Sequence, residues 1–322
     1  MRAAGGAQTL AQVKQRGALN CGVDVGAPGF AVKDDKGKWV GLDVDFCRSI
    51  AAAVLNDPEK VNYVPLTAKV RFTALQNGEI DVLIRDSTLT FTRGTSLKLN
   101  LVGVNFYAGQ GFMVKKSLKA KGVKDLDGAT ICVITGATLE LNIADYNRAN
   151  NVKIGTLLFE RLDEATAALD SGRCDGYTDD TGSLAGARST MKSPDDWEVL
   201  GEVISKEPLG LLVRKGDEEW ADVAKWVLAA LVTAEEDGIT QANVEELAKT
   251  SENPEIRRIL GVEGDLGKML NLDNAWALRA IKTSGNYGEI YERHFGEKGL
   301  KLPRGVNNLW KKGGLMYSYP FR

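Results

Sequence analysis

Polar residues that can bind a small charged molecule stand where several predicted strands end. Asp24 ends an apolar segment at 18–25, and Asp180 ends another at 174–180. Thr138 begins a predicted helix directly after a strand, so its backbone amide points outward with the positive end of the helix dipole. A carboxylate attracts an ammonium group, and a helix N-terminus attracts an anion. Thr138 and Asp180 also suit ordinary helix N-caps, which need no ligand.

The motifs of common metal and catalytic sites are absent from the sequence. The four cysteines form no CxxC pair, and His294 is the single histidine, so a zinc site is not expected. No phosphate loop or nucleophile elbow has the required strand–turn–helix context. We therefore expect neither a metal nor a cofactor.

Length and composition favour a globular protein of two domains. The chain has 322 residues, of which 43% are hydrophobic and 26% charged. The formal net charge of −2 gives no sign of nucleic acid or an anionic membrane as partner. No run approaches the roughly 18 apolar residues of a membrane span. Residues 1–8 lack the apolar run of a secretory leader, so we expect a mature chain with a short remnant of processing or cloning.

Short apolar segments alternate with amphipathic ones, a pattern typical of α/β folds. In the first module we expect strands at 18–25, 61–66 and 80–84, and helices at 42–56 and 70–78. The pattern restarts after residue 116, with expected strands and helices at 124–136, 137–150, 153–160, 161–172 and 174–180. Two α/β modules therefore follow one another along the chain.

Two similar apolar strands, at 109–116 and 208–216, bracket the second module. The simplest topology has the chain leave the first lobe through one and return through the other. Residues 217–322 then complete the first lobe with helices such as 218–238 and 274–296. A connection of two strands permits the lobes to close over a cleft. Two rigidly fused domains are the alternative.

This topology gives lobe boundaries and restricts the cysteine pairing. We assign residues 1–112 and 209–322 to a discontinuous first lobe and residues 113–208 to the second. Among three possible pairings, Cys21–Cys47 with Cys132–Cys174 closes loops of modest length and stays within the lobes. We favour it in an oxidising compartment, and four buried free thiols are the alternative.

Six blocks, in order along the chain, resemble the polar amino-acid family of solute-binding proteins, and most closely the general L-amino-acid-binding proteins of bacterial ABC importers. The blocks are GLDVDFCRSIAAAV, RFTALQNGEIDVLIRDSTLTFTR, YAGQGFMV, LDGATICVITGATLELN, LDSGRCDGYTDD and SKEPLGLLVRKGD. The resemblance implies a type II periplasmic-binding-protein fold with two hinge strands. It implies a periplasmic, monomeric binding protein, not an enzyme, that delivers an amino acid or small amine to the membrane permease of an ABC importer.

The resemblance also assigns ligand-binding roles. Arg93, which closes TLTFTR, matches the arginine that binds the ligand carboxylate, and a solvated surface arginine is the alternative. Thr88 matches the residue whose hydroxyl and amide help to hold that carboxylate, and Asp86 matches a further contact. Thr138 matches a contact of the second lobe. Asp180 matches the carboxylate that pairs with the ligand ammonium.

Three further residues are candidates for side-chain contacts. Asp24 and Phe30 fall where the family contacts the ligand side chain, and Arg71 is an additional pocket candidate. Phe30 either stacks on the ligand or fills the core of the first lobe.

The chain departs from the family at positions of the expected pocket. Asp24 and Asp86 stand where relatives carry Asn, Asp179 replaces Thr, Leu89 replaces Trp, and Ala27 replaces a larger apolar residue. Three changes add negative charge and two remove bulk. Our hypothesis is a cationic or ω-amino ligand, with Asp179 joining the acids of the pocket. Alternatively, Asp86 pairs with a neighbouring arginine.

Three other functions fit the same fold. An enzyme such as a dehydratase needs a general acid or base in the cleft, for which Asp86 or Asp179 would serve. A sensory ectodomain and a laboratory-redesigned sensor scaffold are the others. The clustered departures and the Ala/Gly-rich start fit the sensor scaffold.

Overall fold

The computed structural model describes residues 8–322. We expected residues 1–8 to be the start of a mature chain without a secretory leader. All of these residues except Gln8 lie outside the described range.

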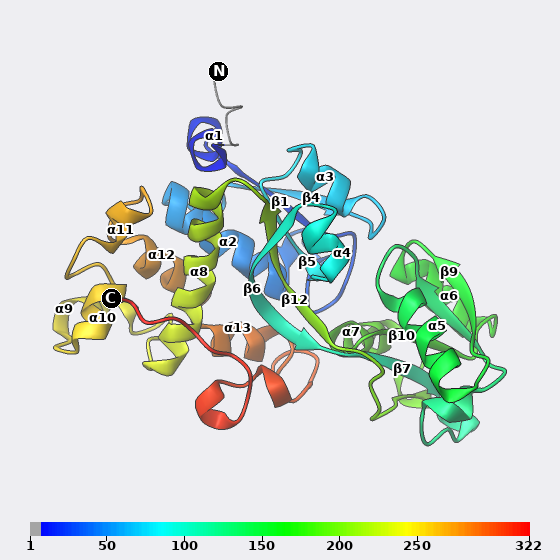
Figure 1. Cartoon of the computed structure of the whole chain (residues 1–322). Helices are drawn as coiled ribbons and strands as arrows, with labels where there is room; N and C mark the ends of the chain where they lie inside the picture. The colour runs from blue at the N-terminus through cyan, green and yellow to red at the C-terminus, as the bar shows by residue number, and fades with distance from the viewer. Residues whose placement is uncertain (1–7) are drawn as a thin grey trace.

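A five-stranded sheet forms the centre of the first lobe (Figure 1). In spatial order its strands are β4 (Val61–Leu66), β1 (Leu19–Asp24), β5 (Val82–Thr88), β12 (Glu207–Arg214) and β6 (Leu99–Ala108). β1 pairs in parallel with β4 and β5, whereas β12 is antiparallel to β5 and β6. Parallel neighbours need crossover connections, which helices provide as the alternating pattern predicted.

Helices from both ends of the chain cover this sheet. α2 (Leu42–Leu55) packs on β1 and β5 and also on α8 (Glu218–Glu236). The helix expected at 274–296 is two helices, α12 (Trp276–Ser284) and α13 (Tyr287–His294). Gly285 has a positive φ of 82°, and the Asn286 side chain accepts a hydrogen bond from the Glu289 amide. The prediction of one helix was wrong because this left-handed glycine and capping box end one helix and start the next.

Smaller elements complete the first lobe. They are α1 (Thr9–Arg16), the hairpin β2 (Val32–Lys33) and β3 (Trp39–Val40), α3 (Arg71–Gln76), α4 (Phe91–Thr95), α9 (Val244–Thr250), α10 (Pro254–Ile259) and α11 (Leu266–Met269). The C-terminal segment runs back over this lobe (Figure 1). There Phe321 is buried against Trp226, and its carbonyl accepts a hydrogen bond from Arg258 on α10.

A second five-stranded sheet forms the other lobe. In spatial order its strands are β11 (Trp197–Val199), β7 (Gln110–Lys115), β10 (Gly176–Asp180), β8 (Thr130–Ile134) and β9 (Gly155–Phe159). β8, β9 and β10 are parallel, and β7 is antiparallel to β10 and β11. Its helices are α5 (Leu139–Asn150), α6 (Leu162–Asp170) and α7 (Thr181–Thr190).

The chain crosses between the sheets twice. It leaves the first sheet at Gly109, between β6 and β7, and returns over residues 200–206, between β11 and β12. The crossings lie against each other, because a Cβ on Gly109 would come within 2.7 Å of the Ser205 carbonyl oxygen. Two adjacent crossings are the arrangement expected of a hinge. The lobe boundaries at 112/113 and 208/209 stay a prediction.

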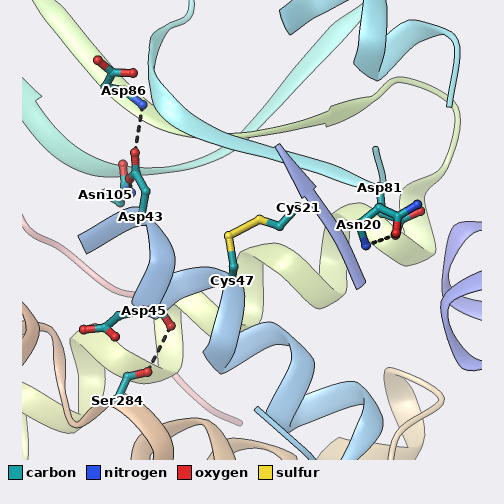
Figure 2. The surroundings of a disulfide bond; sticks show 9 residues. All are labelled: Asn20, Cys21, Asp43, Asp45, Cys47, Asp81, Asp86, Asn105 and Ser284. Carbon is teal, nitrogen blue, oxygen red and sulfur yellow. Dashed lines mark hydrogen bonds between the residues drawn. A yellow bond between two sulfur atoms is a disulfide. The ribbon is translucent and has the colours of Figure 1, made fainter. Parts of the chain in front are cut away.

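Both predicted disulfides are present. Cys21–Cys47 joins β1 to α2 with a Cα–Cα distance of 6.1 Å (Figure 2). Cys132–Cys174 joins β8 to the turn before β10 with a Cα–Cα distance of 5.7 Å. The pairing within each lobe is therefore confirmed, and the free-thiol alternative was wrong.

In the described range 8–322, no helix combines the length and apolar character needed to cross a membrane.

Candidate functional site

A cavity that is partly open to solvent lies between the two lobes. The cavity brings together most of the residues predicted from the sequence: Asp24, Arg71, Asp86, Thr88 and Arg93 from the first lobe, and Thr138, Asp179 and Asp180 from the second. Ala27 also lines it, whereas Leu89 is not among its lining residues.

The fold places these side chains together because they follow the ends of strands. Asp24 and Thr88 are the last residues of β1 and β5, and Asp180 is the last residue of β10. Thr138 directly precedes α5 and Asp180 directly precedes α7, yet neither side chain makes a capping hydrogen bond. The alternative of ordinary side-chain N-caps was therefore wrong at both positions.

Arg85 neutralises two of the acids that the charge hypothesis invoked. Its guanidinium forms ion pairs with Asp24 and with Asp86, the latter at 3.0 Å. Its Nε also donates to the Leu66 carbonyl oxygen at 3.0 Å. Burial lowers the pKa of Arg85, but the neighbouring carboxylates outweigh burial and raise it. The alternative in which Asp86 pairs with a neighbouring arginine is the one observed.

Asp86 is held in a strained conformation by a residue behind the cavity. Its φ of 33° is positive, which is uncommon for a residue other than glycine. Its backbone N–H donates to Asp43 Oδ2 at 3.0 Å, and Asn105 Nδ2 donates to Asp43 Oδ1 at 2.9 Å (Figure 2). Burial, together with the Asp86 carboxylate, raises the pKa of Asp43 to about 7. Asp43 therefore fixes the backbone of a cavity residue without lining the cavity.

Two other arginines of the cavity form no ion pair within residues 8–322. Arg93 is 8% exposed, so the alternative of a solvated surface residue was wrong, and its Nη1 donates to the Thr88 carbonyl at 2.8 Å. Arg71 is 2% exposed, and its buried Nε and Nη1 have no partner in the described chain. Both guanidiniums pack against the Phe72 ring. Burial lowers the pKa of each guanidinium.

The second lobe contributes two adjacent acids with different partners. Asp179 accepts a hydrogen bond from the Tyr177 hydroxyl and another from the Asp180 backbone at 2.8 Å. Burial is the main cause that raises the pKa of Asp179 to about 7. Asp180 is 6% exposed, and its buried Oδ1 has no partner among residues 8–322. Burial, with Asp179 and Glu207, raises the pKa of Asp180 well above its usual value.

Glu207 is a residue near this site that the sequence did not single out. It is 2% exposed at the start of β12, and it accepts hydrogen bonds from the hydroxyls of Thr88 and Thr138 at 2.5 and 3.0 Å. A hydroxyl has one proton to donate, so only the amides of these threonines remain as donors to a ligand. The sequence did contain one signal for Glu207: it is an acidic residue directly before the apolar strand expected at 208–216.

Phe30 is the predicted site residue that the cavity does not include. It is fully buried, with its ring 5.1 Å from that of Phe106 and 4.8 Å from that of Phe295. The expectation of a ligand contact was wrong, and the alternative, filling the core of the first lobe, is observed. Helix α7 of the second lobe reaches this ring, since a Cβ on Gly182 would lie 2.9 Å from Phe30 Cζ.

The single histidine lies away from the cavity. His294 ends α13 and its Nε2 is 2.7 Å from Asp45 Oδ2. His294 is therefore not available as a general acid or base for a dehydratase in this cavity. Across residues 8–322, no cluster of three His, Cys, Asp or Glu side chains is placed to hold a metal ion.

Comparison with known proteins agrees with this architecture. Residues 19–247 match the family of bacterial extracellular solute-binding proteins, family 3. The general L-amino acid-binding periplasmic protein AapJ of Rhizobium johnstonii is 52% identical over 322 residues, covering 99% of this chain and 94% of that protein. The glutamate/glutamine/aspartate/asparagine-binding protein BztA of Rhodobacter capsulatus is 53% identical over 320 residues, covering 99% and 95%.

A solved structure has almost the same fold. It is an ABC transporter/periplasmic binding protein from Brucella ovis with glutathione bound, with a TM-score of 0.95 and 53% identity, covering 98% of this chain and all of that one. The predicted two-lobed periplasmic-binding-protein fold and the family resemblance are thus confirmed, and these relatives are named as binding proteins, not enzymes. The chain belongs to family 3 of the bacterial extracellular solute-binding proteins.

Proposed function

We propose that this protein binds an amino acid in the cavity between its lobes, closes around it in the periplasm, and delivers it to an ABC importer. The names of AapJ and BztA, both amino-acid-binding proteins, support this function. Closure follows from the lining, since a ligand that contacts both lobes gains those contacts only in the closed form.

The observation that carries the proposal is a set of buried charges of opposite sign on the two walls of the cavity that form no ion pair. Arg93 and Arg71 have no ion-pair partner on the first lobe, and Asp180 Oδ1 has none on the second, within the described residues. A buried polar atom without a partner is costly. A zwitterion satisfies both sides when its carboxylate meets Arg93 and its ammonium meets Asp180.

The second guanidinium gives the ligand class. With Arg93 assigned to the α-carboxylate, the donors of Arg71 await another acceptor, which a side-chain carboxylate or amide supplies. We therefore propose an acidic or amide amino acid, or a γ-glutamyl compound. The name of BztA includes glutamate and glutamine, and the Brucella ovis protein holds glutathione, itself a γ-glutamyl peptide.

The cationic or ω-amino ligand that we first expected is the competing candidate. Its support is reduced to Asp179 and Asp180, because Asp24 and Asp86 already pair with Arg85. A basic ligand also leaves Arg71 without an acceptor.

The partners follow from the function. A monomer suffices, because the two lobes of one chain supply both walls of the cavity. The partner for delivery is the membrane permease of the importer, which we propose recognises the closed form. This assignment comes from the family and not from any residue of the cavity.

Isothermal titration calorimetry with a ligand panel tests the proposal. The panel contains glutamate, glutamine, reduced glutathione, alanine, arginine, lysine and γ-aminobutyrate. We expect binding of glutamate or a γ-glutamyl compound, and a loss of about 2–5 kcal/mol of binding free energy in Arg93→Ala and Asp180→Asn. Thr156→Val, on an exposed part of β9, is a control that should bind as wild type does. Unchanged affinity in both cavity variants would refute the proposal, and tight lysine binding without glutamate binding would favour the cationic ligand.

A further inference from the structure

Glu207 lies where the two lobes meet beneath the cavity. It is the first residue of β12, pairs with Ala108 of β6 in the first sheet, and directly follows the return crossing. Its Oε2 accepts from the Thr88 and Thr138 hydroxyls, and its Oε1 accepts from Asn142 Nδ2 at 2.8 Å and Ser205 Oγ at 2.7 Å.

The four donors come from different parts of the molecule. Thr88 ends β5 of the first sheet and Ser205 belongs to the crossing. Thr138 directly precedes α5 of the second lobe, and Asn142 lies in the first turn of that helix. The bonds from α5 therefore span the two lobes. Separation of the lobes breaks them and leaves the carboxylate with its first-lobe and crossing partners.

The chemistry of this contact favours closure. A carboxylate at the N-terminus of a helix is stabilised by the unpaired amides and the positive end of the helix dipole. α5 has 12 residues, and Glu207 reaches its first turn from the other lobe. Hydrogen bonds to an ionised group in a buried setting are stronger than those between neutral groups. Closure therefore gains these bonds even without a ligand.

We propose that Glu207 is a positioning residue, a clasp that holds the N-terminus of α5 against the first lobe and stabilises the closed form independently of the ligand. Neither Glu207 nor Asn142 is among the residues that line the cavity. The clasp acts through Thr138 and Asn142 on the second lobe and Thr88 on the first, whose side chains it engages.

Asn142→Ala is the sharpest test, because it removes one bond between the lobes without changing a cavity residue. Asn150→Ala is the matched control in the same helix, since Asn150 donates only within α5, to the Tyr146 carbonyl. Fluorophores on the two lobes report their separation by energy transfer in ligand-free protein. Stopped-flow release of glutamate, or of whichever amino acid binds, reports ligand escape.

We expect ligand-free Asn142→Ala to be more open than wild type, and to release ligand about tenfold faster, the effect of losing one hydrogen bond to a charged group. The rank order of ligands should stay unchanged, because the cavity is intact. Glu207→Gln should also open the protein. The double variant should be no more open than the more open single variant, because both act through one contact.

The clasp is refuted if Asn142→Ala matches Asn150→Ala in lobe separation and release rate, or if its effect adds fully to that of Glu207→Gln. The release readout rests on the proposed function, but the ligand-free separation does not. If no amino acid binds, the proposed function fails while the energy-transfer measurement still decides the clasp.

Discussion

Replacement of Arg71 by methionine removes a buried cation while keeping an unbranched side chain. Arg71 is 2% exposed at the start of α3, and its Nε and Nη1 have no partner in the described part of the chain. Burial, together with Arg85 and Arg93, lowers the pKa of Arg71 well below its usual value. On our proposal, a second acidic group of the ligand satisfies these donors. The substitution should therefore act selectively on ligands that carry such a group.

The magnitude follows from the two unsatisfied donors. A hydrogen bond to a charged group contributes about 1.5–3 kcal/mol, so two contribute about 3–6 kcal/mol. Part of this lost binding free energy is offset. Burying the Arg71 donors without partners costs about 1–3 kcal/mol before a ligand binds, and the methionine variant avoids that cost. We expect a net loss of about 2–4 kcal/mol for glutamate, a rise in Kd of roughly 30- to 900-fold. Alanine has no second acid, so its affinity should stay the same or improve.

Calorimetric titration of both ligands into wild type and Arg71→Met measures this difference. Arg148→Met is the matched control, because the Arg148 side chain is 80% exposed on α5. An equal loss for glutamate and alanine would mean that Arg71 is merely structural. An unchanged glutamate affinity would remove Arg71 from the site and with it the argument for an acidic ligand.

Three further changes test the fold behind the site. Asp43→Asn removes a carboxyl whose pKa burial raises to about 7. The folded wild type therefore holds a proton that the unfolded chain releases near pH 4, and its unfolding free energy should fall by roughly 4 kcal/mol as pH rises from about 4 to above 7. Denaturant unfolding should show a larger fall in wild type than in Asp43→Asn, which retains Asp179 with its own raised pKa, and parallel curves would contradict this. Replacing Cys132 and Cys174 by alanine opens a loop with a sequence separation of 42, which should lower stability by up to about 4 kcal/mol in chemical unfolding, with ligand affinity within a few fold of wild type. Gly186→Ala places a Cβ against the Pro28 carbonyl oxygen of the opposite lobe, so ligand affinity should fall at least about tenfold by calorimetry while the melting temperature stays within a few degrees.

The elements and cavity residues that sequence predicts best are those with a local signal. Asp24, Thr138 and Asp180 were predictable because they stand at the ends of strands or the start of a helix, where ligand sites of α/β folds gather. The cysteine pairing was predictable because few alternatives exist and the lobes exclude some of them.

Strand β5 shows why local signals fail at a site. We expected a strand at 80–84, but β5 runs from Val82 to Thr88 and includes the buried Arg85 and the strained Asp86. Charged residues in a strand contradict the apolar pattern on which the prediction depends. Charged residues in a buried strand are expected at a binding site, where partners far along the chain compensate for their burial. Here the compensation comes from Asp24, far along the chain, so no local pattern contains it.

The distribution of charge in the cavity links recognition to closure. Arg85 is paired with Asp24 and Asp86, and Glu207 accepts from donors of both lobes, so each of these buried charges has partners within the protein. Arg71 and Asp180 are buried without such partners in the described chain, so closing the lobes over these groups alone has a desolvation cost that an open, hydrated form avoids. A zwitterion removes that penalty on both walls at once. On our proposals, the clasp at Glu207 stabilises the closed form for every ligand, whereas the unsatisfied groups decide which ligand keeps the lobes closed.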